Sequence, residues 1–265
     1  MSAPNKVYTT SNYGMFKSLT ANRGINRRRV SKVADGIRTV GQIVPIIVNE
    51  KYEIIDGQAR LEACKQLNIP ISYVIKTDIG IKECRNVNTT GTRWTAADYI
   101  KSYAESGNIN YQYLDLLLKR FRALGSQDVI SAVQGRFSNA RHIQNGDFLC
   151  DETRYMEATD VLAFEESLLN VLKATNGRTD LYKHALGFCA VHPKIDNAKL
   201  FSQIMKYRIS LVPISTVEQA LTVIEQIYNR SARERIYIAT EYKRMIDKGM
   251  TWYEYRDFIN QGVRK

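Results

Sequence analysis

The sequence is poor in the residues that build metal sites and disulfide frameworks. Only four cysteines and three histidines occur among its 265 residues. The cysteines are widely separated and form no C-x-x-C pair, and the histidines show neither H-x-x-x-H nor H-E-x-x-H spacing. Zinc sites and disulfide-stapled scaffolds depend on such spacings. We therefore expect no metal site built from protein ligands, and cysteines that stay reduced.

Long apolar runs are missing as well. The longest run, Ile43 to Val48, is the length of a strand and contains Pro45, whereas a membrane-spanning helix needs about 20 apolar residues. The first residues lack the apolar core of a signal peptide. Because 44% of residues are hydrophobic and 25% are charged, the composition is that of an ordinary globular protein. We expect a soluble, cytoplasmic protein of one or two domains with no membrane partner.

Positive charge is what the sequence has in excess. Lys and Arg number 38 against 27 Asp and Glu, for a net charge of +11. The excess is uneven: residues 15–38 hold seven basic residues and one acidic, residues 126–165 three and seven, and residues 201–265 eleven and seven. A basic head, an acidic middle and a basic tail predict separate charged faces. A basic face favours a polyanionic partner such as DNA.

The first 80 residues have the pattern of a small α/β unit. Apolar residues at helical spacing predict a helix over 30–40 that stops at Gly41. Two short β-branched runs, 43–48 and 52–55, flank a turn and predict a hairpin. A helix is expected from 58 to 68 and a third strand over 70–75.

From about residue 94 the pattern is helical throughout. Thr95 is a candidate N-cap for the first of these helices, and a continuous helical stretch is expected over 216–247. The predicted fold is therefore an α/β domain with a small mixed sheet over residues 1–92, followed by an all-α domain over 93–265.

The sharpest local signal is the stretch Ile54-Ile-Asp-Gly-Gln-Ala-Arg60, in which a strand leads through a glycine turn into a helix. The first N–H groups of a helix have no partner within the helix and carry the positive end of its dipole, so such a turn can receive a phosphate. Gly57 allows close approach of the backbone, Arg60 adds a forked charge, and Gln58 an amide. Asp56 could cap the helix, hold a metal or act as a base. A plain Asp-Gly turn followed by a solvated arginine is the alternative.

This stretch resembles the ParB/sulfiredoxin-like superfamily, and in particular the phage and plasmid ParB-like proteins that carry an Asp-Gly-Gln-His-Arg box. The similarity extends to the Asn22-Arg23-x-Ile25-Asn26 segment, to Pro45-Ile46-x-Val48-Asn49 and to the strand at 70–75. It implies binding of a nucleoside triphosphate, CTP or ATP, with Mg²⁺ as its companion. It also implies DNA as a partner, a phage or plasmid gene in a bacterial host, and an NTPase or nuclease (DNase) activity in some members.

One residue departs from that box. Position 59 is Ala where the similar proteins carry His, and alanine can neither shuttle a proton nor contact a phosphate through its side chain. A natural binder that has lost its chemistry and an introduced inactivating substitution both fit. Whether the chain is an enzyme is therefore left open, with phosphohydrolase as the class if it is active.

The candidate site residues follow from the turn and from the resemblance. For catalysis they are Asp56, Gln58 and Arg60, with Ala59 at the histidine position. For nucleotide or phosphate binding they are Asn22, Arg23, Pro45, Gly57, Asn88, Arg93, Trp94 and Thr95. Trp94 could stack on a base or anchor the core. In partition-type ParB proteins the corresponding box reads Gly-Glu-Arg-Arg, followed by Glu-Asn-x-x-Arg; this chain has neither pattern, since Asn88 and Arg93 are five residues apart.

Two basic segments are candidates for nucleic-acid binding. Arg27, Arg28 and Arg29 precede or open a helix, and Arg230, Arg233 and Arg235 alternate with aromatic residues on a predicted helix over 228–237. Such surfaces track a phosphate backbone. The three arginines at 27–29 could instead hold a triphosphate tail, and a solvated charged face is the alternative for both segments. Three functions remain: a ParB-like protein coupling nucleotide to DNA, an enzyme acting on a free nucleotide or another phosphorylated small molecule, and a catalytically silent protein-binding scaffold. A homodimer fits each of them.

Overall fold

The computed structural model describes residues 6–22, 24–87, 94–137, 141–174, 178–230 and 234–263. The chain divides into two compact units, Met1–Asn108 and Ile109–Lys265, which we call the first and second unit. The helix capped by Thr95 falls within the first unit, so the division lies further along the chain than the expected boundary at 92/93.

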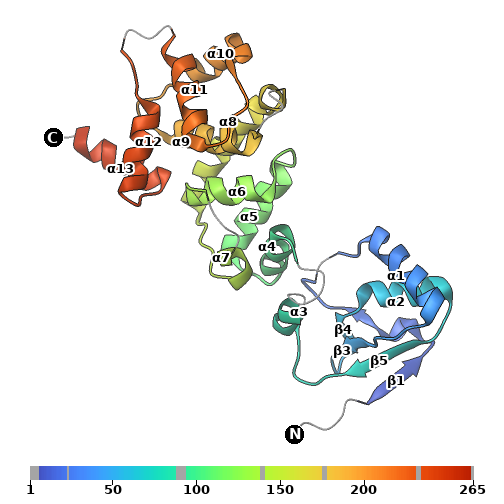
Figure 1. The fold of residues 1–265 in the computed structure, drawn as a ribbon. Helices are drawn as coiled ribbons and strands as arrows, with labels where there is room; N and C mark the ends of the chain where they lie inside the picture. Colours follow the sequence, from blue (N-terminus) through green and yellow to red (C-terminus); the bar gives the residue numbers. More distant parts are fainter. Residues whose placement is uncertain are drawn as a thin grey trace. The chain divides into compact units, whose positions relative to one another are not determined.

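The first unit is built on a five-stranded mixed sheet in the order β1-β5-β3-β4-β2 (Figure 1). As predicted, β3 and β4 form an antiparallel hairpin, and β5 lies parallel to β3. Two short strands that sequence patterns did not indicate complete it: β1 pairs antiparallel with β5, and β2 pairs parallel with β4. The strands are β1 (Val7–Thr10), β2 (Lys17–Ser18), β3 (Ile46–Val48), β4 (Glu53–Asp56) and β5 (Ile71–Ile75).

Two helices pack together to cover one face of this sheet (Figure 1). Both were predicted, and α1 ends at Gly41, whose φ of 73° is the left-handed conformation that glycine adopts without penalty. Their apolar faces meet the sheet in one core, to which Val30 and Ile37 contribute from α1 and Leu61 from α2. The helices of the first unit are α1 (Arg27–Val40), α2 (Gln58–Leu67), α3 (Ile81–Val87) and α4 (Ala96–Glu105), and η1 (Tyr13–Met15) is a 3₁₀ turn.

Gln42 fastens the segment before β3 to the neighbouring strand. Its side-chain oxygen accepts from the Ser72 N–H at 2.7 Å and its amide donates to the Ser72 carbonyl at 3.0 Å. The amide thus pairs with the backbone as a strand residue would, and it holds Ile43 and Val44 at the surface, 74% and 56% exposed.

The second unit is helical throughout its described residues, as the sequence predicted (Figure 1). Its helices are α5 (Ile109–Arg120), α6 (Ser126–Gln134), α7 (Arg141–Asn145), α8 (Glu152–Lys173), α9 (Thr179–Val191), α10 (Asn197–Lys206), α11 (Val217–Asn229), α12 (Ile238–Asp247) and α13 (Trp252–Val263), with a 3₁₀ turn η2 (Arg208–Ser210). No helix among the described residues has the length and apolar character required to cross a bilayer.

The predicted continuous helix over 216–247 is wrong. It is two helices, because α11 ends at Asn229. The Asn229 side chain accepts from the Ile236 N–H at 3.0 Å and donates to the Ile236 carbonyl at 2.9 Å, which closes a loop instead of extending the helix. The alternating aromatic and basic residues of 228–237 therefore do not share one helical face.

The core of the second unit contains unusually polar groups. Glu165 and His184 are buried at 2% and 4% exposure, and the Lys183 ammonium lies 2.6 Å from the Asp128 carboxylate. Trp252 is also buried, against the His184 ring at a centroid distance of 4.9 Å. The four cysteines are each buried and are not joined by disulfides.

Candidate functional site: a pocket at three helix N-termini

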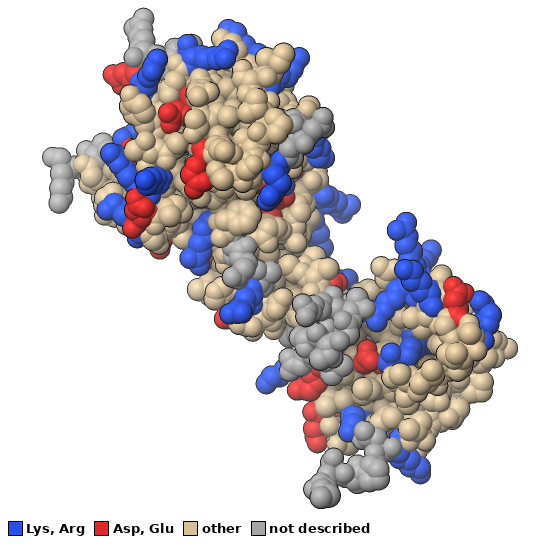
Figure 2. Space-filling model, viewed as in Figure 1, with Lys and Arg blue, Asp and Glu red and all other residues tan. Residues whose placement is uncertain are grey.

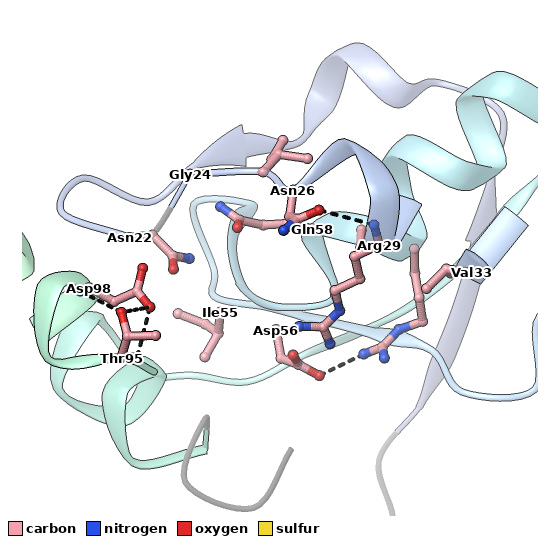
Figure 3. A pocket seen from close by; sticks show the side chains of 14 residues that line it. Asn22, Gly24, Asn26, Arg29, Val33, Ile55, Asp56, Gln58, Thr95 and Asp98 are labelled. Atoms are coloured by element: carbon pink, nitrogen blue, oxygen red, sulfur yellow. Dashed lines mark hydrogen bonds and ion pairs between the residues drawn. The ribbon is translucent and has the colours of Figure 1, made fainter. Parts of the chain in front are cut away.

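A pocket of about 290 Å³ opens in the first unit. Figure 3 shows its walls, which come from the loop before α1 and from the first turns of α1, α2 and α4. It is lined by Asn22, Gly24, Ile25, Asn26, Arg29, Val33, Ile55, Asp56, Gly57, Gln58, Ala59, Arg60, Thr95 and Asp98. Three helices therefore direct their N-terminal ends at one cavity.

The Asp56-Gly57 turn, where β4 leads into α2, lines this pocket. Gly57 has φ 104° and ψ 18°, a left-handed conformation that costs other residues about 1–2 kcal/mol. A Cβ at this position would lie 2.5 Å from Cγ2 of Ile46. Conformation and space thus both demand glycine where β4 becomes α2, which explains the Asp-Gly pair seen in the sequence.

The three helix ends differ in how their N–H groups are satisfied. The side chain of Asn26 caps α1 by accepting from the Arg29 N–H at 3.2 Å. Thr95 and Asp98 cap α4 reciprocally, with Asp98 Oδ2 2.8 Å from the Thr95 nitrogen (Figure 3). At α2 the N-cap is Gly57, and no side chain among the described residues caps it. The N–H groups that open α2 are therefore the ones left to bind a ligand.

Arg60 stands at the edge of the pocket with donor capacity to spare. Its Nη2 donates to Asp56 Oδ2 at 2.6 Å and, at the long distance of 3.5 Å, to the Pro45 carbonyl. Its Nε is buried and has no partner in the described part of the chain. A buried donor without an acceptor costs about 1–3 kcal/mol. A ligand oxygen that accepted a hydrogen bond from Nε would remove this cost.

Arg29 was grouped with Arg27 and Arg28 as a candidate contact to DNA phosphates or to a triphosphate tail. It is half-buried and lines the cavity, and in Figure 3 its side chain extends toward Asp56. The signal that could have found it is Asn26: an N-cap there puts Arg29 in the first turn of a helix, beside the other two helix ends. Asp98 of α4 also lines the pocket, and it was not among the predicted site residues.

Several other predicted residues also line the pocket. Asn22, Gly57, Gln58, Ala59 and Thr95 do so together with Asp56 and Arg60. Asn22 is held by donating to the Ile54 carbonyl at 3.3 Å. Arg23, Asn88 and Arg93 lie outside the described residues. Pro45 contributes its carbonyl to Arg60 but does not line the cavity.

Trp94 is a packing residue. It is 4% exposed, its ring centroid is 5.2 Å from that of Tyr99, and it does not line the pocket. The expected role of stacking on a base is therefore corrected to the alternative, an anchor in the core. The physical reason is the hydrophobic effect: burying a large apolar side chain stabilises the fold by about 1.5–3 kcal/mol.

The basic surface residues occupy two places. Arg27 and Arg28 are exposed on the first turn of α1, beside the pocket, and Figure 2 shows Lys and Arg gathered there. Arg230 is exposed at the end of α11, where its guanidinium lies 4.6 Å above the Tyr207 ring. Arg235 is exposed in the following loop, and Arg233 lies outside the described residues.

Comparison with known proteins places the first unit in a family. Residues 17–87 match the model of the ParB N-terminal domain. No curated protein matches the chain. Among solved structures, a Pnob8-like ParB-N domain is 14% identical and aligns over 94% of this chain and 99% of its own length, with a TM-score of 0.32. The assignment rests on the family match, and it agrees with the five-stranded mixed sheet and its helices.

Proposed function

We propose that this chain, whose first unit is a ParB-like domain, binds a nucleoside triphosphate in the pocket and couples that binding to DNA. The observation that carries the proposal is the uncapped N-terminus of α2 facing a cavity edged by Arg29 and Arg60. Backbone N–H groups at a helix N-terminus bind phosphate, because they lack partners and carry the positive end of the dipole. Two guanidiniums add forked donors that match phosphate oxygens.

Asp56 acts in this proposal as a positioning residue. Its carboxylate accepts from the Arg60 guanidinium at 2.6 Å, which fixes that guanidinium beside the pocket. The described residues contain no cluster of three or more His, Cys, Asp or Glu arranged for a metal. A Mg²⁺ ion brought in by a triphosphate needs only one or two carboxylates beside the phosphates, and Asp56 and Asp98 are the two that line the pocket.

The DNA part of the proposal rests on the first turn of α1. Arg27 and Arg28 are exposed while Arg29, on the same turn, lines the pocket. One helical turn thus presents cations to the surface and to the ligand. Phosphates neutralised by surface arginines release counterions, so the affinity must fall as salt rises.

Ala59 makes binding without hydrolysis the expected state. It lines the pocket and packs against the core of the first unit, and it offers no group for proton transfer. We expect no turnover of CTP or ATP by this chain. Replacing Ala59 with His restores a titratable group at the pocket wall, and turnover that appears only in that variant would favour an enzyme acting on nucleotide.

Calorimetric titration with CTP, with ATP and with pyrophosphate, each with Mg²⁺, tests the pocket. Arg60→Ala should weaken binding by about 10- to 100-fold, the loss of a hydrogen bond to a charged group. The matched control is Arg38→Ala, an exposed arginine at the other end of α1. The pocket proposal fails if none of the three compounds binds, or if both variants bind equally well.

DNA retention measured against salt concentration tests the second part. The double variant Arg27→Ala, Arg28→Ala should lower the slope of log affinity against log salt by about 2, since each phosphate contact contributes about 0.9. A salt-independent retention, or an unchanged slope in the variant, would remove DNA from the proposal and leave nucleotide binding standing.

A further inference from the structure

The second unit exposes an apolar stripe with a basic border that serves no part of the proposed function. Ile209 is 92% exposed, Val212 47%, and Phe201 and Met205 36% each. Phe201 and Met205 lie one turn apart on α10, Ile209 lies in η2, and Val212 follows η2 in the chain. Exposed apolar groups that recur in this way mark interaction sites more often than solitary ones do. We call this stripe, with its neighbouring cations, the basic patch.

The border of the basic patch is cationic throughout. Lys206, Arg208 and Arg230 are exposed around the stripe, and Arg230 is fixed by the Tyr207 ring at 4.6 Å and by the Ser210 hydroxyl at 3.3 Å. Residues 197–217 contain no Asp or Glu. Figure 2 shows Lys and Arg side chains at the part of the second unit where α10 lies. An occupant must therefore combine apolar side chains with negative charge.

A second surface of the same unit combines exposed apolar side chains with negative charge. Leu149 is 79% exposed and Met156 is 62% exposed, and they lie on the approach to α8 and on its first turns. The exposed acidic residues around them are Asp151, Glu152 and Asp160. Residues 152, 156 and 160 recur every four positions, so they share one face of α8. We call this the acidic patch.

The two patches belong to different parts of the second unit. Next to Met156, Tyr155 packs on Tyr113 of α5 with ring centroids 5.1 Å apart, and Arg154 lies 3.6 Å from the centre of the Tyr253 ring of α13. The basic patch instead borders α11, through the contact of Arg230 with Tyr207. The patches are thus offered to solvent on separate elements.

We propose that the basic patch of one chain docks on the acidic patch of a second copy of the same chain. The apolar residues of each patch would be buried against the other, while opposite charges meet at the rim and fix the orientation. Because the two surfaces are different, the contact is heterologous, and repeating it produces a ring or an open chain of molecules. Part of the acidic middle and part of the basic tail of the sequence thus supply the two surfaces of this contact.

Sedimentation velocity of the full chain, free of nucleic acid, tests this assembly over a range of concentrations. The wild type should form species larger than a monomer, and raised salt should dissociate them. Reversing the basic patch with Lys206→Glu and Arg208→Glu, or the acidic patch with Glu152→Lys and Asp160→Lys, should each raise the dissociation constant more than about tenfold, because like charges then meet. Lys243→Glu, an exposed lysine of α12, is the control and should change nothing.

Mixing the two reversed variants gives the decisive measurement. Each variant carries two patches of one sign and cannot pair with itself, but the unaltered acidic patch of one still fits the unaltered basic patch of the other, so the mixture should associate. A monomeric wild type, loss of association from one reversal only, or a mixture that stays dissociated overturns the proposal. Ile209→Ser and Met156→Ser should weaken association too, whereas Leu116→Ser, at an exposed apolar residue of α5, should not. Circular dichroism confirms that each variant is folded.

Discussion

A short contact between an aspartate and a cation occurs in each unit, Arg60 with Asp56 in the first and Lys183 with Asp128 in the second, and the two contacts have different surroundings. Both are 2.6 Å long. In the first unit the Arg60 and Asp56 side chains are 22% and 32% exposed at the edge of a pocket. In the second unit Lys183 and Asp128 are 13% and 11% exposed. A pair beside a cavity can exchange a partner for a ligand, whereas an enclosed pair serves the fold alone.

The surroundings of the enclosed pair show how the second unit manages its buried charge. Burial, and next the charge of Asp128, raise the pKa of Glu165 well above its ordinary value of 4.5, while Lys183 opposes them. Burial also lowers the pKa of both His184 and His192 from 6.5 to about 4. Burial thus favours the neutral forms of Glu165, His184 and His192 in this unit, while the charged Arg60–Asp56 pair of the first unit lies at the edge of a pocket.

Removing the cation from each pair should give the largest difference in stability loss between the two units. Lys183→Met leaves Asp128 enclosed without its partner and should cost about 3–5 kcal/mol of unfolding free energy in the second unit. Arg60→Met should cost the first unit less than about 1 kcal/mol, since its pair is partly solvated. Urea unfolding followed by hydrogen exchange of each unit measures both, with exposed Lys173→Met as control. Equal losses in the two units would break the comparison.

Within the first unit, we expect the turn at Gly57 to be the position least tolerant of substitution. Gly57→Ala places a Cβ 2.5 Å from Ile46 in a left-handed conformation, so we expect a loss of about 2–4 kcal/mol from strain and overpacking together. Gly36→Ala is the matched control: nothing lies within 4 Å of its Cβ in the middle of α1, and it should stabilise by about 0.5–1 kcal/mol. Thermal unfolding compares the two, and a neutral Gly57→Ala would contradict the geometry.

Acid should destabilise the second unit and largely spare the first. The unfolded chain binds protons at His184 and His192 below pH 6.5 while the folded chain does not, so the stability that they contribute is lost as pH falls toward 4. Glu165 acts in the opposite direction, because its folded carboxyl holds a proton that the unfolded chain releases above 4.5. Two losses against one gain leave a net fall in the unfolding free energy as the pH drops below 6.5. The first unit has no histidine and serves as the internal reference in urea unfolding over this pH range.

Replacing Glu165 by a neutral side chain should have the smallest effect on stability. It tests whether Glu165 opposes the two histidines in the pH dependence. Glu165→Gln removes the need to bind a proton on folding, so we expect a higher unfolding free energy at neutral pH. The pH slope below 6.5 should steepen to about 2.7 kcal/mol per unit, because only the two histidines remain. Glu166→Gln on the neighbouring residue is the control. A variant that is less stable at neutral pH would mean that Glu165 is ionised in the fold.

Local signals in the sequence predicted the parts of the fold that local chemistry decides. The hairpin of β3 and β4, the stop at Gly41, the turn at Gly57 and the cap at Thr95 each depend on residues a few positions apart. By contrast, β1 and β2 are strands only because distant partners pair with them, and α11 ends because Asn229 reaches Ile236. Those contacts have no local signature.

The same distinction applies to the pocket. The Asp56 to Arg60 segment is one continuous turn, so its residue types allowed a phosphate site, which the family resemblance then favoured over a plain turn, and their functional roles stay a prediction. Arg29 and Asp98 enter the pocket from two other helices, whose convergence depends on how α1 and α4 pack. Trp94 could be assigned to core or ligand only by its burial.

The pairing of β1 with β5 also constrains how the chain can fold during synthesis. Val7 to Thr10 lie opposite Val74 to Ile71, so the first strand to leave the ribosome waits for the last strand of its sheet. Until then its backbone N–H and C=O groups are open to other chains. The backbone hydrogen bonds within each helix of the second unit join residues four positions apart, so each helix can begin to form as it emerges, even though α13 later packs back on α6, where the Tyr253 hydroxyl donates to the Ala132 carbonyl. Slowing translation before β5 should therefore increase aggregation more than the same pause placed within the helices.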